Sequence, residues 1–79
     1  MKNKMNKELY RVEKDSEEFL KGIGADNYRM VNVLEFMKLV SENNLEGRVG
    51  VRDFELGQTS LTQVYVELNG EYVYSTTIN

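Results

Sequence analysis

The chain has 79 residues and a formal charge of −3, and it contains neither cysteine nor histidine. Without cysteine there is no thiol nucleophile, iron–sulfur cluster or thiolate zinc site, and without histidine the commonest general base and transition-metal ligand is missing. Acid–base chemistry at neutral pH would need a carboxylate, lysine or tyrosine whose pKa is shifted by several units in a deep site, and a core this small can hardly provide one. We therefore expect a protein that is not an enzyme and that holds no metal or cofactor.

Length and hydropathy predict one small α+β domain over residues 1–79 that does not enter a membrane. The content of 41% apolar and 29% charged residues is typical of a folded chain rather than a disordered one. No apolar run approaches the roughly 18 residues of a membrane span, and no apolar segment follows the basic start as it would in a secretory signal. We expect a cytoplasmic protein in which residues 1–6 form a flexible basic arm.

Charge is distributed unevenly along the chain. Residues 1–14 carry five basic and two acidic side chains, whereas residues 15–79 carry five basic and eleven acidic ones. A basic arm on an acidic body is one way to contact nucleic-acid phosphates, although a solvated helix start is the simpler interpretation. The cations of this candidate nucleic-acid arm are Lys2, Lys4, Lys7 and Arg11.

The first segment predicts a long amphipathic helix that ends near Gly22. Its stripe has helical spacing with one polar interruption and consists of Met5, Leu9, Val12, Ser16, Phe19 and Ile23. Gly22 suits the left-handed position after a helix, with Ile23 packing back. The alternative interpretation begins the helix near Asp15, which has capping-box spacing to Glu18, and makes residues 8–13 an edge strand.

A second helix is predicted over residues 28–43, capped by Asp26 or Asn27. Its main apolar stripe comprises Met30, Val33, Leu34, Met37 and Val40. Asn44 suits the left-handed position that ends this helix, and Leu45 is the expected returning contact.

Other apolar residues of the second helix lie away from this stripe, so we expect the helix to be covered on two sides. The sheet is expected beneath it, with either the first helix or a second copy of the chain on the other side. The candidate residues for this dimer or helix seam are Phe36, Leu39, Leu9 and Val12.

The last third of the chain predicts an antiparallel sheet. Strands are expected at residues 48–55, 62–68 and 71–78, with a loop at 57–60. The dipeptide Asn69-Gly70 predicts a two-residue type I′ turn, because both central positions of that turn need positive φ.

A two-residue turn also fixes the hairpin register, placing Leu68 opposite Glu71 and Tyr65 opposite Tyr74. The face with Val64, Val66, Leu68 and Val73 should pack on the helices, and the tyrosine face should be the outer one. We predict a partner-binding surface there, made of Tyr65, Glu67, Tyr72, Tyr74 and Glu71. The simpler interpretation is that the tyrosines only stabilise the hairpin.

These elements predict two helices on one face of a three-stranded antiparallel sheet, in the order ααβββ. The alternative, with an N-terminal edge strand, has the order βαβββ. The first functional hypothesis is a small accessory or inhibitor protein that occupies a surface of a larger partner, a type common in AT-rich bacteria and their phages. The alternatives are a nucleic-acid-associated regulator that uses the basic arm and a dimeric self-assembly module.

Overall fold

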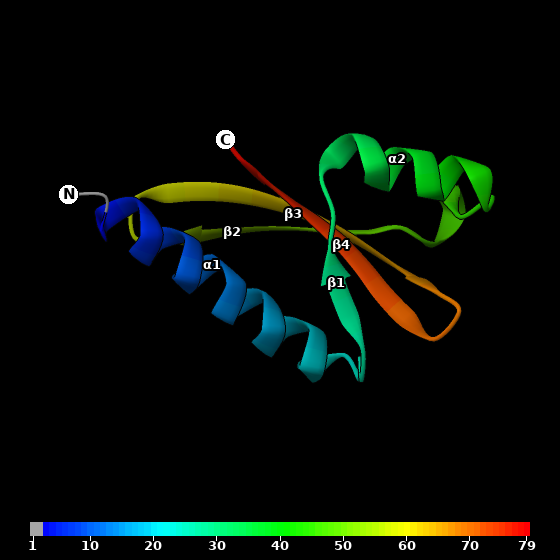
Figure 1. The fold of residues 1–79 in the computed structure, drawn as a ribbon, viewed down its shortest axis with the longest axis horizontal. Helices are drawn as coiled ribbons and strands as arrows, with labels where there is room; N and C mark the ends of the chain where they lie inside the picture. The colour runs from blue at the N-terminus through cyan, green and yellow to red at the C-terminus, as the bar shows by residue number, and fades with distance from the viewer. Residues whose placement is uncertain (1–2) are drawn as a thin grey trace.

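The computed structural model describes residues 3–79, with side chains from Arg11 onward. Two helices, one short 3₁₀ helix and a four-stranded sheet make up this part of the chain (Figure 1). In chain order they are α1 (Asn3–Gly22), β1 (Tyr28–Met30), α2 (Val33–Glu42), η1 (Glu46–Arg48), β2 (Gly50–Leu56), β3 (Thr59–Leu68) and β4 (Glu71–Ile78).

The sheet is mixed and has the strand order β1-β4-β3-β2, so the prediction of a three-stranded antiparallel sheet is wrong. β2, β3 and β4 pair antiparallel, and β1 adds to β4 in parallel. Backbone bonds extend this pairing beyond β1, from the Val31 N–H to the Tyr74 carbonyl at 2.8 Å and from the Tyr72 N–H to the Asn27 carbonyl at 2.9 Å. The sequence did not reveal β1 because three residues are too few to show a strand period.

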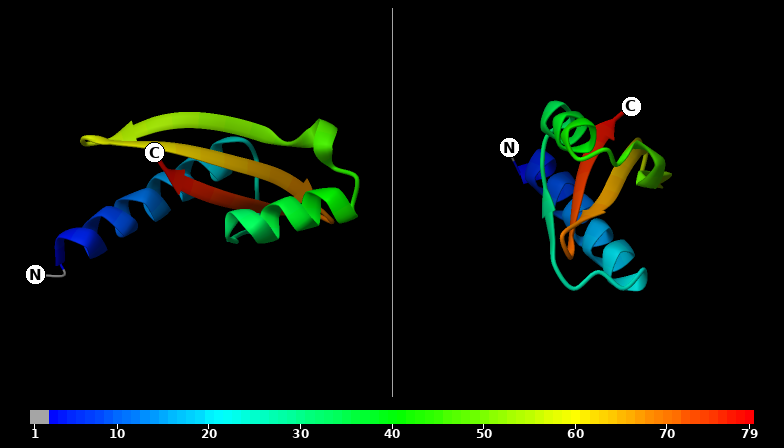
Figure 2. Two further views of the ribbon diagram at one scale, coloured as in Figure 1. Left: turned by 90° about the horizontal axis from the view of Figure 1, so that it is seen from above. Right: turned by 90° about the vertical axis from the view of Figure 1, so that its right-hand side faces the viewer.

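The two helices lie on opposite faces of the sheet, not on one face as predicted. Leu20 of α1 packs with Tyr74, whereas Phe36 of α2 packs with Val73. Because consecutive strand residues point to opposite faces, these neighbouring contacts place the helices on opposite sides. β3 and β4 run between α1 and α2 in Figure 1, and Figure 2 shows the same arrangement from two further sides.

Each helix therefore has its own core cluster. The α1 cluster consists of Leu20, Ala25 and Tyr74 with the half-buried Phe19, Tyr28, Tyr65 and Tyr72. The α2 cluster consists of Val31, Phe36, Val40, Leu45, Val66 and Val73 with the half-buried Leu39, Val49, Val64 and Leu68. The valine face of the hairpin thus packs against a helix as predicted, but against α2 alone.

The long first helix is confirmed, and the alternative strand at residues 8–13 is wrong, since α1 spans Asn3–Gly22. The helix ends in a Schellman motif two residues later than predicted. The Ala25 N–H donates to the Leu20 carbonyl at 2.9 Å, and Gly24, not Gly22, takes the positive φ of 93°. Ala25, not Ile23, is the buried residue that packs back on the helix.

α2 begins five residues later than predicted, because Asn32 rather than Asp26 or Asn27 is its N-cap. The Asn32 Oδ1 accepts a hydrogen bond from the Glu35 N–H at 2.8 Å. The predicted end is confirmed. Asn44 has φ 53°, and the Leu45 N–H donates to the Val40 carbonyl at 2.9 Å while Leu45 is buried.

Both hairpins close through two-residue turns. Asn69 and Gly70 have φ of 53° and 83°, and the predicted register is confirmed, with Tyr65 opposite Tyr74. The loop predicted at residues 57–60 is shorter in the structure, because Leu56 already pairs with Thr59.

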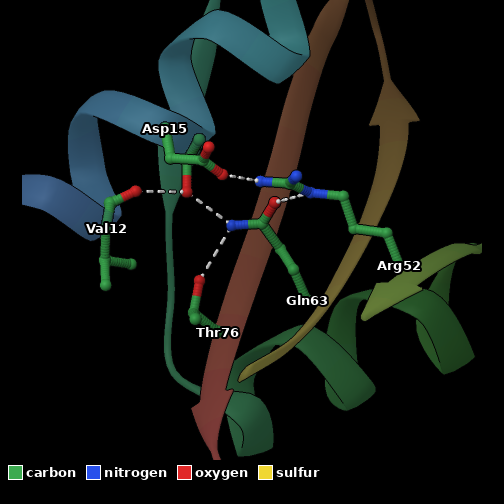
Figure 3. A network of polar contacts seen from close by, with 6 residues as sticks. Val12, Asp15, Arg52, Gln63 and Thr76 are labelled. Carbon is green, nitrogen blue, oxygen red and sulfur yellow. Dashed lines mark hydrogen bonds and ion pairs between the residues drawn. The ribbon is translucent and has the colours of Figure 1, made fainter. Parts of the chain in front are cut away.

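A buried polar network joins α1 to the sheet through the amide of Gln63, which has no exposed surface (Figure 3). The Gln63 Nε2 donates to the Ser16 Oγ at 2.6 Å and to the Thr76 Oγ1 at 2.9 Å. The Ser16 hydroxyl in turn donates to the Val12 carbonyl at 2.8 Å. Among the described residues no buried side-chain N or O atom lacks a partner, so the network is complete. Ser16, the polar interruption of the predicted stripe, is thus the contact point of α1.

Arg52 extends this network to the open edge of the sheet. Its Nε donates to the Gln63 Oε1 at 2.9 Å, and its Nη2 forms an ion pair with the Asp15 Oδ2 at 2.7 Å. The guanidinium carbon lies 4.1 Å from the ring centre of Phe19 and 3.9 Å from that of Phe54. Arg52 therefore fastens β2 to α1 through charge, hydrogen bonds and cation–π contact together.

We expect Gln63→Met to lower the free energy of unfolding by about 1–3 kcal/mol, because it leaves the Arg52 Nε–H without its acceptor and removes both amide donors. Urea unfolding followed by circular dichroism measures the change. The control Gln58→Met, in the exposed β2–β3 turn, should change stability by less than about 0.5 kcal/mol. Equal effects of the two variants would show that the network does not stabilise the fold.

Gly50 provides a second test, since it lies opposite Tyr65 and a Cβ at Gly50 would overlap the Tyr65 ring. We expect Gly50→Ala to destabilise the protein by about 1–3 kcal/mol through overpacking. Gly47→Ala is the control, because no atom lies within 4 Å of the added Cβ at that position. Equal thermal-unfolding midpoints for the two variants would contradict the close packing of the Tyr65 ring against Gly50.

Candidate protein-binding surface

The hairpin tyrosines lie on the face that α1 covers, so the predicted outer tyrosine surface is not an open one. Tyr74 is only 6% exposed, and Tyr65 and Tyr72 are half-buried. The Tyr65 ring meets Phe19 of α1 edge-on, with ring centres 5.1 Å apart. Strand alternation correctly identified which side chains share this face, but a sheet covered on both sides has no outer face for them to occupy.

The two glutamates of the predicted surface lie on different faces. Glu67 pairs with Tyr72 across the hairpin and is exposed. Glu71 is on the α2 side, where its Oε1 accepts a hydrogen bond from the Arg29 Nε at 3.1 Å. The five residues therefore do not form one contact surface.

The candidate seam residues are also separated. Phe36 is 4% exposed and belongs to the core of its own chain, and Leu39 is half-buried against the same α2 cluster. Val12 is half-buried in α1, and the side chain of Leu9 lies outside the described residues. Phe36 packs on the sheet, so it is not available to a second copy.

The basic arm overlaps the first helix. α1 begins at Asn3, so Lys4 and Lys7 are helical, although their side chains lie outside the described part of the structure. Lys2 lies outside it altogether, and Arg11 is exposed. Of the four candidate cations, the structure thus describes the side chain of Arg11 only.

Among the described residues, large exposed apolar side chains gather on α2. Val33 is 41% exposed, Leu34 79% and Met37 60%, and we name these three residues the α2 ridge. All three belong to the main apolar stripe predicted from spacing, so the expectation that this stripe faces the sheet is wrong for them, although Val40 of the same stripe is buried. The reason is that Phe36, Leu39 and Val40 follow the same i, i+3, i+4 spacing, and only packing on the sheet decides which set is buried.

Shallow hollows lie on both flanks of the ridge. One, of about 450 Å³, is lined by Leu34, Glu35, Lys38, Leu39 and Glu42. The other, of about 270 Å³, is lined by Phe36, Met37, Val40, Ser41 and Glu46. Helices pack by placing side-chain ridges into grooves, and a ridge between two hollows has a shape compatible with such packing.

This surface offers apolar contact rather than reactive groups. Within the described residues, no group of three or more acidic side chains is arranged to hold a metal ion. No helix in the same part of the chain has the length and apolarity needed to cross a membrane.

The burial of Tyr74 on the sheet face that α1 covers can be measured through the ionisation of its hydroxyl. Burial raises the pKa of its hydroxyl above the usual value of about 10, and the negative charges of Glu13 and Glu17 on α1, together with the neighbouring Tyr28, raise it further. A raised folded-state pKa stabilises the protein fully below the unfolded-state pKa, and this contribution is lost as pH rises through the folded-state pKa.

We therefore expect stability to fall above about pH 10 and Tyr74→Phe to reduce that fall, since phenylalanine does not ionise. Urea unfolding at a series of pH values from neutral to strongly alkaline measures it. In the control Tyr72→Phe, the Tyr74 hydroxyl is still present. The loss of stability that its ionisation causes at alkaline pH should therefore remain. An unchanged pH profile in Tyr74→Phe would contradict the burial of Tyr74 beneath α1.

Comparison of the chain with protein-family models, with curated proteins and with solved structures finds no match. The argument for a function therefore depends on the surface itself.

Proposed function

We propose that the protein is a small non-catalytic binding protein of the cytoplasm that occupies a surface of a larger protein through its α2 ridge. The main observation behind this proposal is that two large apolar side chains of a ten-residue helix are exposed, Leu34 at 79% and Met37 at 60%. Large apolar side chains that are exposed together on one element are typical of interaction sites. Inhibition of an enzyme by steric cover is one use of such a surface.

The rigidity of α2 supports this role. Its first turn is capped by Asn32, and its last turn is closed by the bond from the Leu45 N–H to the Val40 carbonyl. Phe36 and Val40 anchor the helix in the core. The ridge is thus ordered before any partner arrives, which lowers the entropy cost of binding. The flexible side chain of Met37 adapts easily to the shape of a contact.

The composition supports a binding role over catalysis. The chain has no cysteine or histidine, and the buried polar groups described above are used by the Gln63 network. Its lack of cysteine is compatible with the reducing interior in which we place it. A binding protein without catalytic groups acts by covering a surface of its partner, here through the α2 ridge.

Affinity capture from a lysate of the source organism tests the proposal. We expect the double substitution Leu34→Gln and Met37→Gln to reduce capture of the partner by at least about tenfold, because two glutamines remove the apolar contact while keeping helix propensity. The control Val51→Gln and Ile78→Gln changes two similarly exposed side chains on β2 and β4 and should leave capture unchanged.

Circular dichroism and thermal unfolding must show that both double variants are folded. Undiminished capture by the folded Leu34→Gln, Met37→Gln variant would contradict the proposal, and equal loss in the control would show that the ridge is not the contact.

A further inference from the structure

We infer that the segment received by the α2 ridge is an amphipathic helix whose apolar side chains are flanked by lysine or arginine. This inference rests on the proposed function and names the chemistry of the partner. It is carried by the charges that line the two hollows beside the ridge.

The hollows carry a surplus of carboxylates. Glu35 and Glu42 line one hollow together with Lys38, and Glu46 lines the other. All four of these charged side chains belong to exposed residues, so a partner that covered the ridge would also exclude water from them. Removing a charge from water without giving it a partner is costly. A purely apolar partner therefore fits this surface poorly, whereas one with cationic flanks pairs the three carboxylates.

The same charges argue against a second copy of the chain as the occupant. Two copies joined across their ridges would bring two acidic rims together, with one lysine in each to offset three glutamates. Like charges at close range disfavour such an interface. The net charge of residues 15–79 also favours a cationic partner over a second copy. These residues carry five basic and eleven acidic side chains, so they attract cationic partners over a distance.

A helix is the form that matches the geometry. The ridge residues Val33, Leu34 and Met37 lie in the first half of α2, with Leu34 lining one hollow and Met37 the other. A helix lying along the axis of α2 can place an apolar row against the ridge and its own flanking side chains over the hollows. Cations at those flanking positions reach Glu35 and Glu42 on one side and Glu46 on the other.

Fluorescence anisotropy with designed peptides tests the inference. The probe is a labelled amphipathic helical peptide of leucine and lysine, and the matched peptide has glutamate in place of every lysine. We expect the lysine peptide to bind at least about tenfold more tightly than the glutamate peptide, with affinity falling as salt increases. Equal binding of both peptides, or no binding of the lysine peptide, would overturn the inference.

Two triple variants separate the rim charges from general attraction. Glu35→Gln, Glu42→Gln and Glu46→Gln should weaken binding of the lysine peptide by at least about tenfold. The control removes the same charge at the exposed Glu18, Glu55 and Glu67 and should change binding by less than about twofold. Equal weakening by both triple variants would overturn the inference, because it would mean that net charge alone drives binding.

The same variants distinguish failure of the inference from failure of the proposed function. If Leu34→Gln, Met37→Gln abolishes partner capture but the rim variant does not weaken it, the ridge is the contact and the inference about charge is wrong. Sedimentation equilibrium of the 9.2 kDa chain should give a monomer. A dimer that Leu34→Gln, Met37→Gln dissociates would overturn the cationic partner in favour of a second copy.

Discussion

The amide of Gln63 is the interaction on which the arrangement of the layers depends. An amide buried in the middle of a sheet needs two acceptors and one donor, and here Ser16, Thr76 and Arg52 supply them from α1, β4 and β2. The pattern also fixes the orientation of the amide, since a flipped side chain would point its NH₂ group at the Arg52 Nε–H. α1 can satisfy this group only if Ser16 lies directly over Gln63, which selects both the face that α1 covers and its position along the sheet.

The location of α1 then determines which face of the sheet is left for α2 to cover. With α1 over the tyrosine face, α2 packs on the valine face through Phe36 and Val40. A helix that is apolar on two sides but has a sheet on only one of them must leave large apolar side chains exposed. The α2 ridge is thus the surface that the two-sided arrangement leaves uncovered, and its acidic flanks give that surface a preference for a cationic partner.

Local patterns predicted the parts of the fold that local physics governs. The Asn69-Gly70 turn and the hairpin register follow from turn geometry and strand alternation, and the end of α2 at Asn44 follows from the tolerance of asparagine for positive φ. β1 was missed because it exists only through pairing with β4. For the site, spacing correctly placed Val40 toward the sheet but wrongly placed Val33, Leu34 and Met37 there, and the contact surface was predicted on tyrosines that α1 covers.

The sequence by itself thus determined a hairpin with a known register and a chain without cysteine or histidine chemistry, and it favoured a long first helix while leaving a strand at residues 8–13 open. Only the tertiary structure decided that the helices lie on opposite faces, that Ser16 is a contact rather than an interruption, and that Leu34 and Met37 face outward. The physical reason is that helix and strand periods specify which side chains share a face, whereas the choice of the face to bury depends on partners distant in the chain. For α1 that partner is the buried amide of Gln63, 47 residues beyond Ser16.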